Sequence, residues 1–378
     1  MAVRRVPEDF PDIQSAVDAS ASGDRIEVSQ SLGVFSAGAV VTVEGLTIDY
    51  AGGSFDTGRF TLGPGVRSLS LPGPTLFSVI GNDGDNQITG GRATGYLHGL
   101  GGNDVLLGGA GAQWMEGGPG DDGYEVDDAS SPGGQWGFER IPRFRGDRVV
   151  ERPGEGRDVV WAHVDYALPD HVEGLALAGG ARKGYGNEAP NLIVGNGGAN
   201  LLAGLGGDDE LRGGGGGDTY LVGGRGDRVV EAADQGSDEV WAAVDYELPA
   251  HVERLFLDGA AAWGSGNELD NRVVGNDLDN RLVGWAGRDT LTGGAGADIF
   301  YALAGGSSTT TVTDFRPNAG AGDRLGFSRD LFSSPEQAFA AAWQAGPDVW
   351  IARGYNDIPF VLLDTRLADL APGDFLLV

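Results

Sequence analysis

Acidic side chains recur at the sixth position of a nine-residue unit that is rich in glycine. The unit follows the pattern Gly-Gly-x-Gly-x-Asp-x-U-x, where U is a large apolar residue, and its clearest copies start at Gly117, Gly213 and Gly293. Carboxylate and carbonyl oxygens, without sulfur or imidazole, are the ligands that calcium prefers. The pattern therefore predicts calcium sites made from Asp side chains and the bare carbonyls of glycine-rich turns.

The candidate metal ligands are the residues at this sixth position, wherever the repeat stays in phase. Asp supplies a charged oxygen and Asn a neutral one, so each block should grade from weak or metal-free units into strong calcium sites. We predict the charged ligands Asp104, Asp122, Asp209, Asp218, Asp227, Asp289 and Asp298, and the neutral ligands Asn86, Asn200 and Asn280. Asn191 and Asn271 open the two later blocks at the same position.

Turns and short strands must position these ligands. The first six residues of a unit cannot form a regular helix or strand, because several need backbone angles that only glycine adopts readily. The last three can form a strand whose U side chain points inward, so two units make one 18-residue coil that stacks on the next. We predict an all-β protein, a right-handed parallel β-helix or β-roll solenoid with a helical N-terminal cap and a small α+β C-terminal cap.

The two edges of such a solenoid should differ in the block from Gly81 to Glu125. Alternate units share an edge, so the sixth positions on one edge are Asn86, Asp104 and Asp122, and those on the other are Gly95 and Gln113. Gly95 and Gln113 offer no charge. Calcium is therefore expected on one edge of this block and not on the other.

The in-phase nonapeptides resemble the RTX, or hemolysin-type, calcium-binding repeat of secreted bacterial proteins. This resemblance implies calcium as the cofactor, folding that is triggered by calcium, and export by type I secretion machinery. The terminal run Asp374 to Val378, an acidic residue followed by apolar ones, resembles the uncleaved signal that this machinery reads.

Both ends of the chain carry weaker resemblances. The run from Val6 to Val17, followed by Gly23 to Ile26, resembles the start of right-handed parallel β-helix enzymes such as pectate lyases and alginate epimerases, in which a helix plugs the open end. Here Asp9 is expected to cap that helix. Val312 to Phe315 and Gly322 to Leu325 resemble the region after the repeats in serralysin-type metalloproteases, and a helix-like run follows from Pro335 to Gln344.

A long tandem duplication organises the middle of the chain. Gly146 to Glu151 returns as Gly226 to Glu231, and Trp161 returns as Trp241, each 80 positions later and without a gap. Residues 126–141 interrupt the nonapeptide phase and predict a loop. We expect segments at 1–80 (cap and β-helix coils), 81–145 (first RTX block with the loop), 146–225 and 226–308 (the two copies), and 309–378 (cap and secretion signal).

Composition excludes several classes of function. The formal net charge of −29 argues against binding to nucleic acid or to anionic membrane surfaces. There is no cysteine, which excludes disulfides and thiol catalysis, and no stretch of 18 apolar residues that could span a membrane. The first residues lack the apolar core of a signal peptide, so export is expected to use another signal.

Motifs for known catalytic sites are missing from the sequence. It contains no His-Glu-x-x-His, no Gly-x-Ser-x-Gly and no glycine-rich phosphate loop. His171 and His251 are copies of one another in the duplication, which favours a structural role. Trp161 and Trp241 also recur, so packing in the core or between coils is expected for them.

Two hypotheses of function remain from the sequence. The first is a non-enzymatic, calcium-binding RTX protein that is secreted and acts outside the cell or at its surface as an adhesin, matrix or surface-layer component. The alternative is a carbohydrate-active protein or a polysaccharide-binding accessory module. The expected partners are calcium ions, the type I secretion machinery and, for these roles, extracellular polysaccharide or further copies of the chain, with no nucleic acid.

Overall fold

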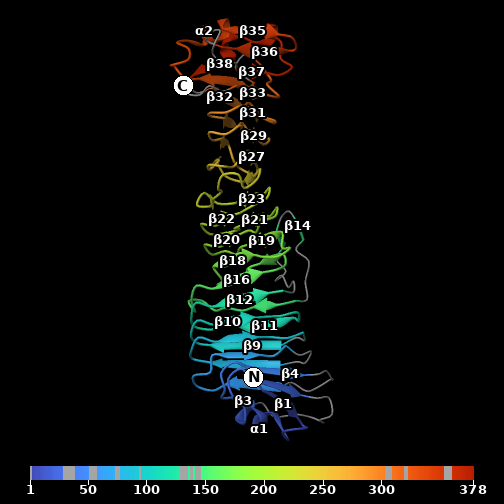
Figure 1. Cartoon of the computed structure of the whole chain (residues 1–378). Helices are drawn as coiled ribbons and strands as arrows, with labels where there is room; N and C mark the ends of the chain where they lie inside the picture. The colour runs from blue at the N-terminus through green and yellow to red at the C-terminus, as the bar shows by residue number, and fades with distance from the viewer. Residues whose placement is uncertain are drawn as a thin grey trace. The chain divides into compact units, whose positions relative to one another are not determined.

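Short parallel strands stacked in successive coils make up most of the protein. The computed structural model describes residues 2–28, 39–50, 58–72, 77–92, 95–127, 135–136, 139–140, 146–302, 309–318, 322–352 and 360–378. Two compact units divide the chain, Met1–Asn196 and Gly197–Val378. Within each unit the strands form parallel sheets on the sides of a β-solenoid, which confirms the predicted fold class (Figure 1).

The first unit builds its coils from alternating strands of two main sheets. Residues 18 positions apart are neighbours, as Val105 and Gly123 are. One sheet contains β1 (Val3–Val6), β2 (Arg25–Val28), β4 (Leu46–Tyr50), β6 (Ser68–Ser70), β8 (Gln87–Thr89), β10 (Val105–Leu107), β12 (Gly123–Val126), β16 (Val159–Ala162), β18 (Gly174–Leu177) and β20 (Leu192–Val194). The other contains β3 (Ala39–Val41), β5 (Gly58–Leu62), β7 (Phe77–Asn82), β9 (Gly95–Leu100), β11 (Gln113–Glu116) and β15 (Arg148–Val149), and a short pair joins β17 (Tyr166–Ala167) to β19 (Lys183–Tyr185).

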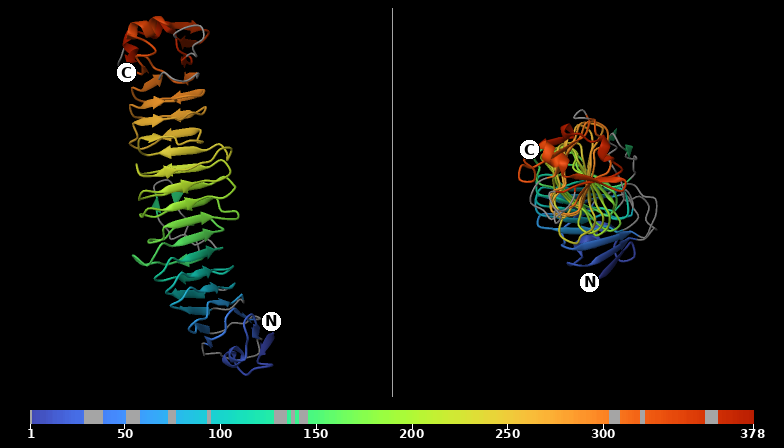
Figure 2. Two further views of the ribbon diagram at one scale, coloured as in Figure 1. Left: turned by 60° about the vertical axis from the view of Figure 1, so that its left-hand side comes forward. Right: turned by 90° about the horizontal axis from the view of Figure 1, so that it is seen from above.

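The second unit repeats this plan and ends in a cap (Figure 2). One short pair contains β22 (Glu210–Arg212) and β24 (Arg228–Val229). A long sheet contains β21 (Leu201–Ala203), β23 (Thr219–Val222), β25 (Glu239–Ala242), β27 (Arg254–Leu257), β29 (Arg272–Val274), β31 (Asp289–Thr292), β33 (Thr310–Val312), β37 (Phe360–Leu362), β36 (Asp348–Ile351) and β35 (Ala342–Ala345). The last sheet contains β26 (Tyr246–Glu247), β28 (Trp263–Ser265), β30 (Arg281–Val283), β32 (Ile299–Ala302), β34 (Arg324–Phe327) and β38 (Phe375–Leu377).

The core is a stack of the apolar side chains at the eighth position of each nine-residue repeat. Leu106 pairs in register with Tyr124, and Tyr124 pairs with Val160. All three side chains are buried, so the period of two within each strand turns the same position inward in every coil. The prediction that U points inward is confirmed.

The N-terminal helix begins later than the sequence predicts. Helix α1 covers Ile13–Asp18, and its N-cap is Asp12, whose carboxylate accepts a hydrogen bond of 2.7 Å from Ser15 N. The prediction of Asp9 as the cap is wrong, because the Asp9 carboxylate instead accepts a hydrogen bond of 2.9 Å from Arg5 N in the preceding turn. Buried Ile13 and Val17 place the apolar face of the helix against the rest of the first compact unit.

The C-terminal cap mixes one helix with strands. Helix α2 covers only Pro335–Ala340, and the rest of the predicted helical run forms β35, which pairs antiparallel with β36. Short 3-10 turns, η1 (Leu367–Asp369) and η2 (Pro372–Asp374), lead into the final strand β38, which pairs parallel with β34. The α+β character of the cap was predicted, but the extent of its helix was not.

Trp161 and Trp241 lie on the surface and not in the core. Their side chains are 41 % and 42 % exposed. Trp241 stacks on Phe256 of the next coil at 4.6 Å between ring centroids, and Trp161 lies so close to Gly123 that a Cβ there would be 2.5 Å from the indole ring. The two side chains therefore pack between coils on the outside, so a core position is wrong for them and packing between coils is confirmed.

The predicted loop at 126–141 is described only in part. Val126 ends β12, and β13 (Gln135–Trp136) and β14 (Glu139–Arg140) form a two-stranded antiparallel sheet of their own. Residues 128–134, 137–138 and 141 of this segment lie outside the described part of the chain. Among the described residues, no helix has both the length and the apolar character needed to cross a membrane.

Candidate metal sites

In the compact unit Met1–Asn196, side chains at the sixth position of successive nine-residue repeats form a buried ladder. Asn86 N donates a hydrogen bond of 2.7 Å to Asp104 Oδ1, and Asp104 N donates one of 2.7 Å to Asp122 Oδ1. All three residues are buried. Each carboxylate thus uses one oxygen to hold the backbone of the preceding coil, which fixes its position along the ladder.

The second oxygen of these carboxylates has no hydrogen-bond partner in the protein. Buried oxygens of this kind belong to Asp104, Asp122, Asp158, Asp218, Asp289 and Asp298, in each case Oδ2. A buried charged oxygen without a partner is costly, because its hydration is lost and nothing replaces it. A bound cation would supply the missing interaction.

Glycines at the first position of each nine-residue repeat create the space beside these oxygens. A Cβ on Gly117 would lie 2.1 Å from Asp122 Oδ2, one on Gly213 would lie 2.2 Å from Asp218 Oδ2, and one on Gly293 would lie 2.2 Å from Asp298 Oδ2. Any side chain would therefore collide with the carboxylate. The bare turn leaves carboxylate and backbone oxygens beside one another, a donor set that suits calcium.

The second unit contains equivalent hydrogen bonds. Asn200 N donates to Asp218 Oδ1 at 2.7 Å, and Asn280 N donates to Asp298 Oδ1 at 2.8 Å. Asn271 N donates to Asp289 Oδ1 at 3.0 Å, and Asp209 N to Asp227 Oδ1 at 3.3 Å. The structure thus places the predicted residues in pairs from neighbouring coils, not in a single cluster.

Comparison with known families agrees with this geometry. A family profile described as the RTX calcium-binding nonapeptide repeat (4 copies) matches residues 94–124, 185–220 and 265–307. The nonapeptides of these three ranges are RTX repeats. Together with the oxygen donors and the glycine turns, the match establishes a calcium-binding β-roll character for these blocks.

Two further similarities cover the chain unevenly. Endo-1,3-1,4-beta-glycanase ExsH from Rhizobium meliloti (strain 1021) is 35 % identical over 100 residues, which is 26 % of this chain and 18 % of the glycanase. The chain therefore spans less than a fifth of that relative. A comparison of structures with the extracellular lipase LipA from Serratia marcescens covers 80 % of this chain and 40 % of the lipase chain, at 17 % identity. Its TM-score of 0.21 supports no argument. The likeness of 309–378 to serralysins stays a prediction.

An Asn at the sixth position of an RTX repeat forms hydrogen bonds to the protein through both the oxygen and the nitrogen of its side chain. Asn86 Oδ1 accepts a hydrogen bond of 2.8 Å from Asn82 N, and its amide nitrogen donates to Val66 O at 3.1 Å. Asn280 likewise accepts from Asn276 N at 2.7 Å and donates to Ala261 O at 3.2 Å. Hydrogen bonds within the protein thus occupy both polar atoms of each side-chain amide, which favours the metal-free end of the predicted gradient for these positions.

Asp227 also differs from the other predicted carboxylates. Its Oδ2 accepts hydrogen bonds from Gly223 N at 3.0 Å and Gly224 N at 2.9 Å, while Oδ1 accepts from Asp209 N. Both oxygens therefore hold the backbone. The role of Asp227 as a metal ligand stays a prediction with less support from geometry than that of Asp218 or Asp298.

The opposite edge of the first RTX block contains an acid that the sequence analysis missed. Gln113 N donates a hydrogen bond of 2.8 Å to Asp147 Oδ1, and Asp127 N donates one of 3.1 Å to Asp147 Oδ2. Asp147 is fully buried. The 80-residue duplication relates it to Asp227, so that alignment could have identified it.

Four more acids lie outside the nonapeptide frame, and three of them, Glu151, Asp158 and Asp238, are buried. Glu151 and Asp158 join Asp122, and Glu231 and Asp238 join Asp218, in two groups whose ligand oxygens all lie within 4.8 Å of one another. The duplication signals that Glu151 and Asp158 recur, but no local pattern shows that they meet a sixth-position Asp.

Burial controls the protonation of these acids in the absence of metal. Loss of hydration raises the pKa of Asp104 to about 7, of Asp158 to about 7 and of Asp122 to about 6. The same effect raises the pKa of Glu151 to about 8, against the opposing hydrogen bond from Tyr124. Without a cation, several of these carboxyls are therefore protonated near neutral pH.

These shifts predict opposite pH dependences with and without calcium. Between about pH 4 and pH 7 the metal-free folded state binds more protons than the unfolded chain, so its free energy of unfolding should fall as pH rises. Calcium needs ionised carboxylates, so the stabilisation by calcium should grow over pH 6 to 8. Circular dichroism of the metal-free chain from about pH 4 to pH 8 follows the first dependence through the fraction that is folded, and urea unfolding of the calcium-loaded protein at the same pH values follows the second. Metal-free stability that rises with pH in this window would contradict the assignment.

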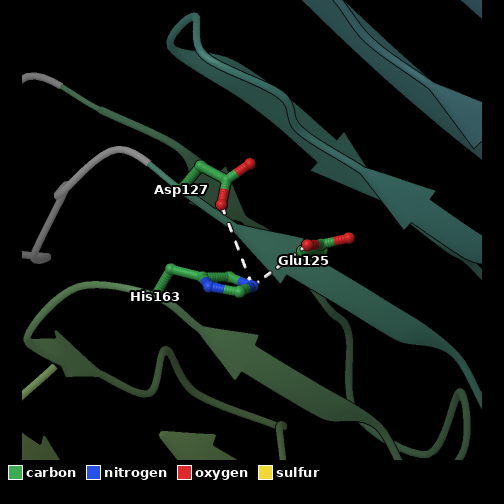
Figure 3. Close-up of side chains that lie close together, drawn as sticks. All are labelled: Glu125, Asp127 and His163. Carbon is green, nitrogen blue, oxygen red and sulfur yellow. Dashed lines mark hydrogen bonds and ion pairs between the residues drawn. The ribbon is translucent and has the colours of Figure 1, made fainter. Parts of the chain in front are cut away.

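One mixed cluster lies on the surface. His163 Nε2 is 3.0 Å from Glu125 Oε1 and 3.9 Å from Asp127 Oδ1, and Figure 3 shows the imidazole directed toward both carboxylates. Both acids and the histidine are partly exposed. The second copy has Ala243 at the position of His163, so the cluster is not part of the duplicated design. Its geometry is that of a surface ion pair.

Proposed function

We propose that this chain is a calcium-folded β-solenoid that acts outside the cell or at its surface as a non-enzymatic structural or adhesive module. RTX repeats supply the calcium sites, and export as an unfolded chain through type I secretion machinery would precede folding. The alternative function is binding or modification of polysaccharide.

The buried ladder of half-satisfied carboxylates carries the proposal. Asp104, Asp122, Asp218, Asp289 and Asp298 each bury an oxygen that no protein group satisfies. In a chain with a net charge of −29, such sites favour an unfolded, metal-free chain where calcium is scarce and a folded chain where it is plentiful. Extracellular calcium modules work at about 10⁻⁴ to 10⁻³ M calcium. A fold that depends on calcium at this level suits an exported protein.

The polysaccharide alternative is favoured by exposed aromatic side chains. Trp343 on β35 and Trp350 on β36 lie opposite one another, 6.2 Å apart between ring centroids, and both are exposed. Sugars stack on such surfaces. The partial similarity to a protein named endo-1,3-1,4-beta-glycanase agrees with a role near polysaccharide, either as a catalyst or as an accessory module.

One experiment separates the two functions. Calcium-loaded protein is incubated with uronic-acid polysaccharides and with mixed-linkage β-glucan, and retention on the polymer and the molecular mass of the polymer are measured. The structural proposal predicts no change in polymer mass and no retention. Retention that is lost in the Trp343→Ala/Trp350→Ala variant, but not in Trp285→Ala, would establish polysaccharide binding. A fall in polymer mass would overturn the non-enzymatic proposal.

A further inference from the structure

Two buried groups of three carboxylates stand apart from the single Asp of an RTX coil. The first group contains Asp122, Glu151 and Asp158, and the second contains Asp218, Glu231 and Asp238. Within each group one oxygen from every side chain lies within 4.8 Å of the others. Five of the six residues are buried, and Glu231 is of intermediate exposure. Each group belongs to one compact unit, the first to Met1–Asn196 and the second to Gly197–Val378.

The same group forms twice although the sequence spacing differs. Glu151 and Asp158 correspond to Glu231 and Asp238 by the 80-residue duplication. The third member does not, since Asp158 follows Asp122 by 36 residues but Asp238 follows Asp218 by 20. The difference of 16 equals the length of the segment 126–141. The fold thus restores the three-carboxylate group across an insertion, which a chance cluster of acids would not require.

Hydrogen bonds from the protein occupy one oxygen of each acid in the first group. Asp122 N donates to Asp158 Oδ1 at 2.8 Å, and the Tyr124 hydroxyl donates to Glu151 Oε1. The hydroxyl in turn accepts a hydrogen bond of 2.8 Å from Gly117 N, so its proton is directed at the glutamate. The remaining oxygens, Asp122 Oδ2, Glu151 Oε2 and Asp158 Oδ2, are buried and have no partner in the protein.

The second group repeats these contacts. Asp218 N donates to Asp238 Oδ1 at 2.7 Å, and the Tyr220 hydroxyl donates to Glu231 Oε1 while it accepts from Gly213 N at 2.7 Å. Asp218 Oδ2 and Glu231 Oε2 are buried without a partner. The arrangement of tyrosine, glutamate and two aspartates is therefore a unit that the chain builds twice.

A third block of the same chain provides an internal comparison. Its last nonapeptide has Asp298 at the sixth position and Phe300 at the eighth, where the other two have Tyr124 and Tyr220. Asp298 N donates to Asp323 Oδ1 at 2.9 Å, but among the described residues no glutamate joins them in a three-carboxylate group. A tyrosine hydroxyl is thus present in the two blocks where a glutamate needs a hydrogen-bond donor. It is absent from the third block, where no glutamate among the described residues joins the aspartates.

No basic side chain in the described part of the chain neutralises the first group. Arg152, which follows Glu151, forms its ion pairs with Glu116 and Glu155. Three carboxylates that share a buried space without a counter-charge require protons or a cation. One oxygen from each of the three side chains lies within 4.8 Å of the others, and each side chain also keeps one buried oxygen without a partner. Such a set of hard oxygen donors matches a divalent hard cation.

We propose that each group is a separate calcium site with three carboxylate ligands, and that the two are the tightest calcium sites of the chain. The affinity of oxygen sites for calcium rises with the number of charged ligands. Among the described residues, no other RTX coil brings three acids together in this way. The proposal deepens the calcium-dependent function above, because it names the sites that fill first as calcium rises. It does not depend on where the protein acts.

Calcium titration of glutamate variants tests the proposal. Glu151→Gln and Glu231→Gln keep the size of the side chain and an acceptor for the tyrosine hydroxyl, but remove the charge. Each is compared, by calorimetry and by equilibrium dialysis with calcium alone, with a control at an exposed glutamate of the same unit, Glu188→Gln or Glu268→Gln. We expect each variant to lose one ion from the tightest class and the double variant to lose two, with the controls unchanged.

Two outcomes decide the matter. Unchanged stoichiometry and affinity in the folded double variant would overturn the proposal and would show that the carboxyls share protons instead, while leaving the extracellular function untouched. If Glu151→Gln does not fold at any calcium concentration, Glu151→Asp replaces it, because it keeps the charge and withdraws the ligand oxygen. The same loss of one tight ion is then expected, and its absence in the folded Glu151→Asp variant overturns the proposal.

Discussion

Removal of calcium is expected to abolish the folded state of the RTX blocks in both units. Without metal, buried carboxylates such as Asp104 and Asp218 face oxygen-lined turns with no compensating charge, and ionising them in that state is costly. Protein in chelator should therefore show an expanded size and a disordered circular dichroism spectrum. Calcium should restore a cooperative β spectrum with a midpoint at about 10⁻⁴ to 10⁻³ M.

Matched variants sharpen this prediction. Asp104→Asn removes one of the half-satisfied buried charges, whereas Asp83→Asn removes a charge from an exposed turn nearby. The Asp104→Asn variant should bind calcium less well than the wild type. Near neutral pH, its metal-free folded state should be less unstable than that of the wild type, because one buried charge without a partner is gone. Asp83→Asn should match the wild type. A cooperative β spectrum that chelator leaves intact would show that the fold does not need calcium.

The second large effect is expected at the final strand. Phe375 is 2 % exposed, stacks on Phe327 at 6.1 Å between ring centroids and meets Phe339 edge to face. Its strand β38 pairs with β34 in register from Leu325 to Phe327. Phe375→Ala should therefore lower the free energy of unfolding of the second unit by about 3–5 kcal/mol, the usual loss for a buried phenylalanine. Val378→Ala, at an exposed position, should be neutral in the same urea titration.

This strand changes what a C-terminal deletion can show. The resemblance of Asp374 to Val378 to a secretion signal predicts that their removal stops export. Because Asp374 and Phe375 are buried in the cap, the deletion should also lower stability. Export of Phe375→Ala and Val378→Ala, measured beside the deletion, separates the effects. Normal export of Phe375→Ala despite its lower stability would favour a signal role for the segment.

The repeating features of this protein could be predicted from its sequence. Gly117, Asp122 and Tyr124 stand at fixed positions of one nine-residue unit, so the turn, the ligand and the core residue follow from local backbone limits and a period of two. Stacking at 18 residues, as between Val105 and Gly123, follows from the same count. The solenoid, its inward side chains and its calcium-binding character therefore follow from the nine-residue repeat alone.

The tertiary structure decided what happens where the period breaks. Glu151 and Asp158 meet Asp122 because a coil interrupted by additional residues returns to the same stack, and no window of nine residues contains that contact. The outward position of Trp161 and the burial of Phe375 likewise depend on which coil lies next to each side chain. Whether Asn86 binds metal or bonds to Val66 O depends on the acceptor in the preceding coil. Such choices are set by contacts between coils, whereas the sequence determines each coil through contacts within it.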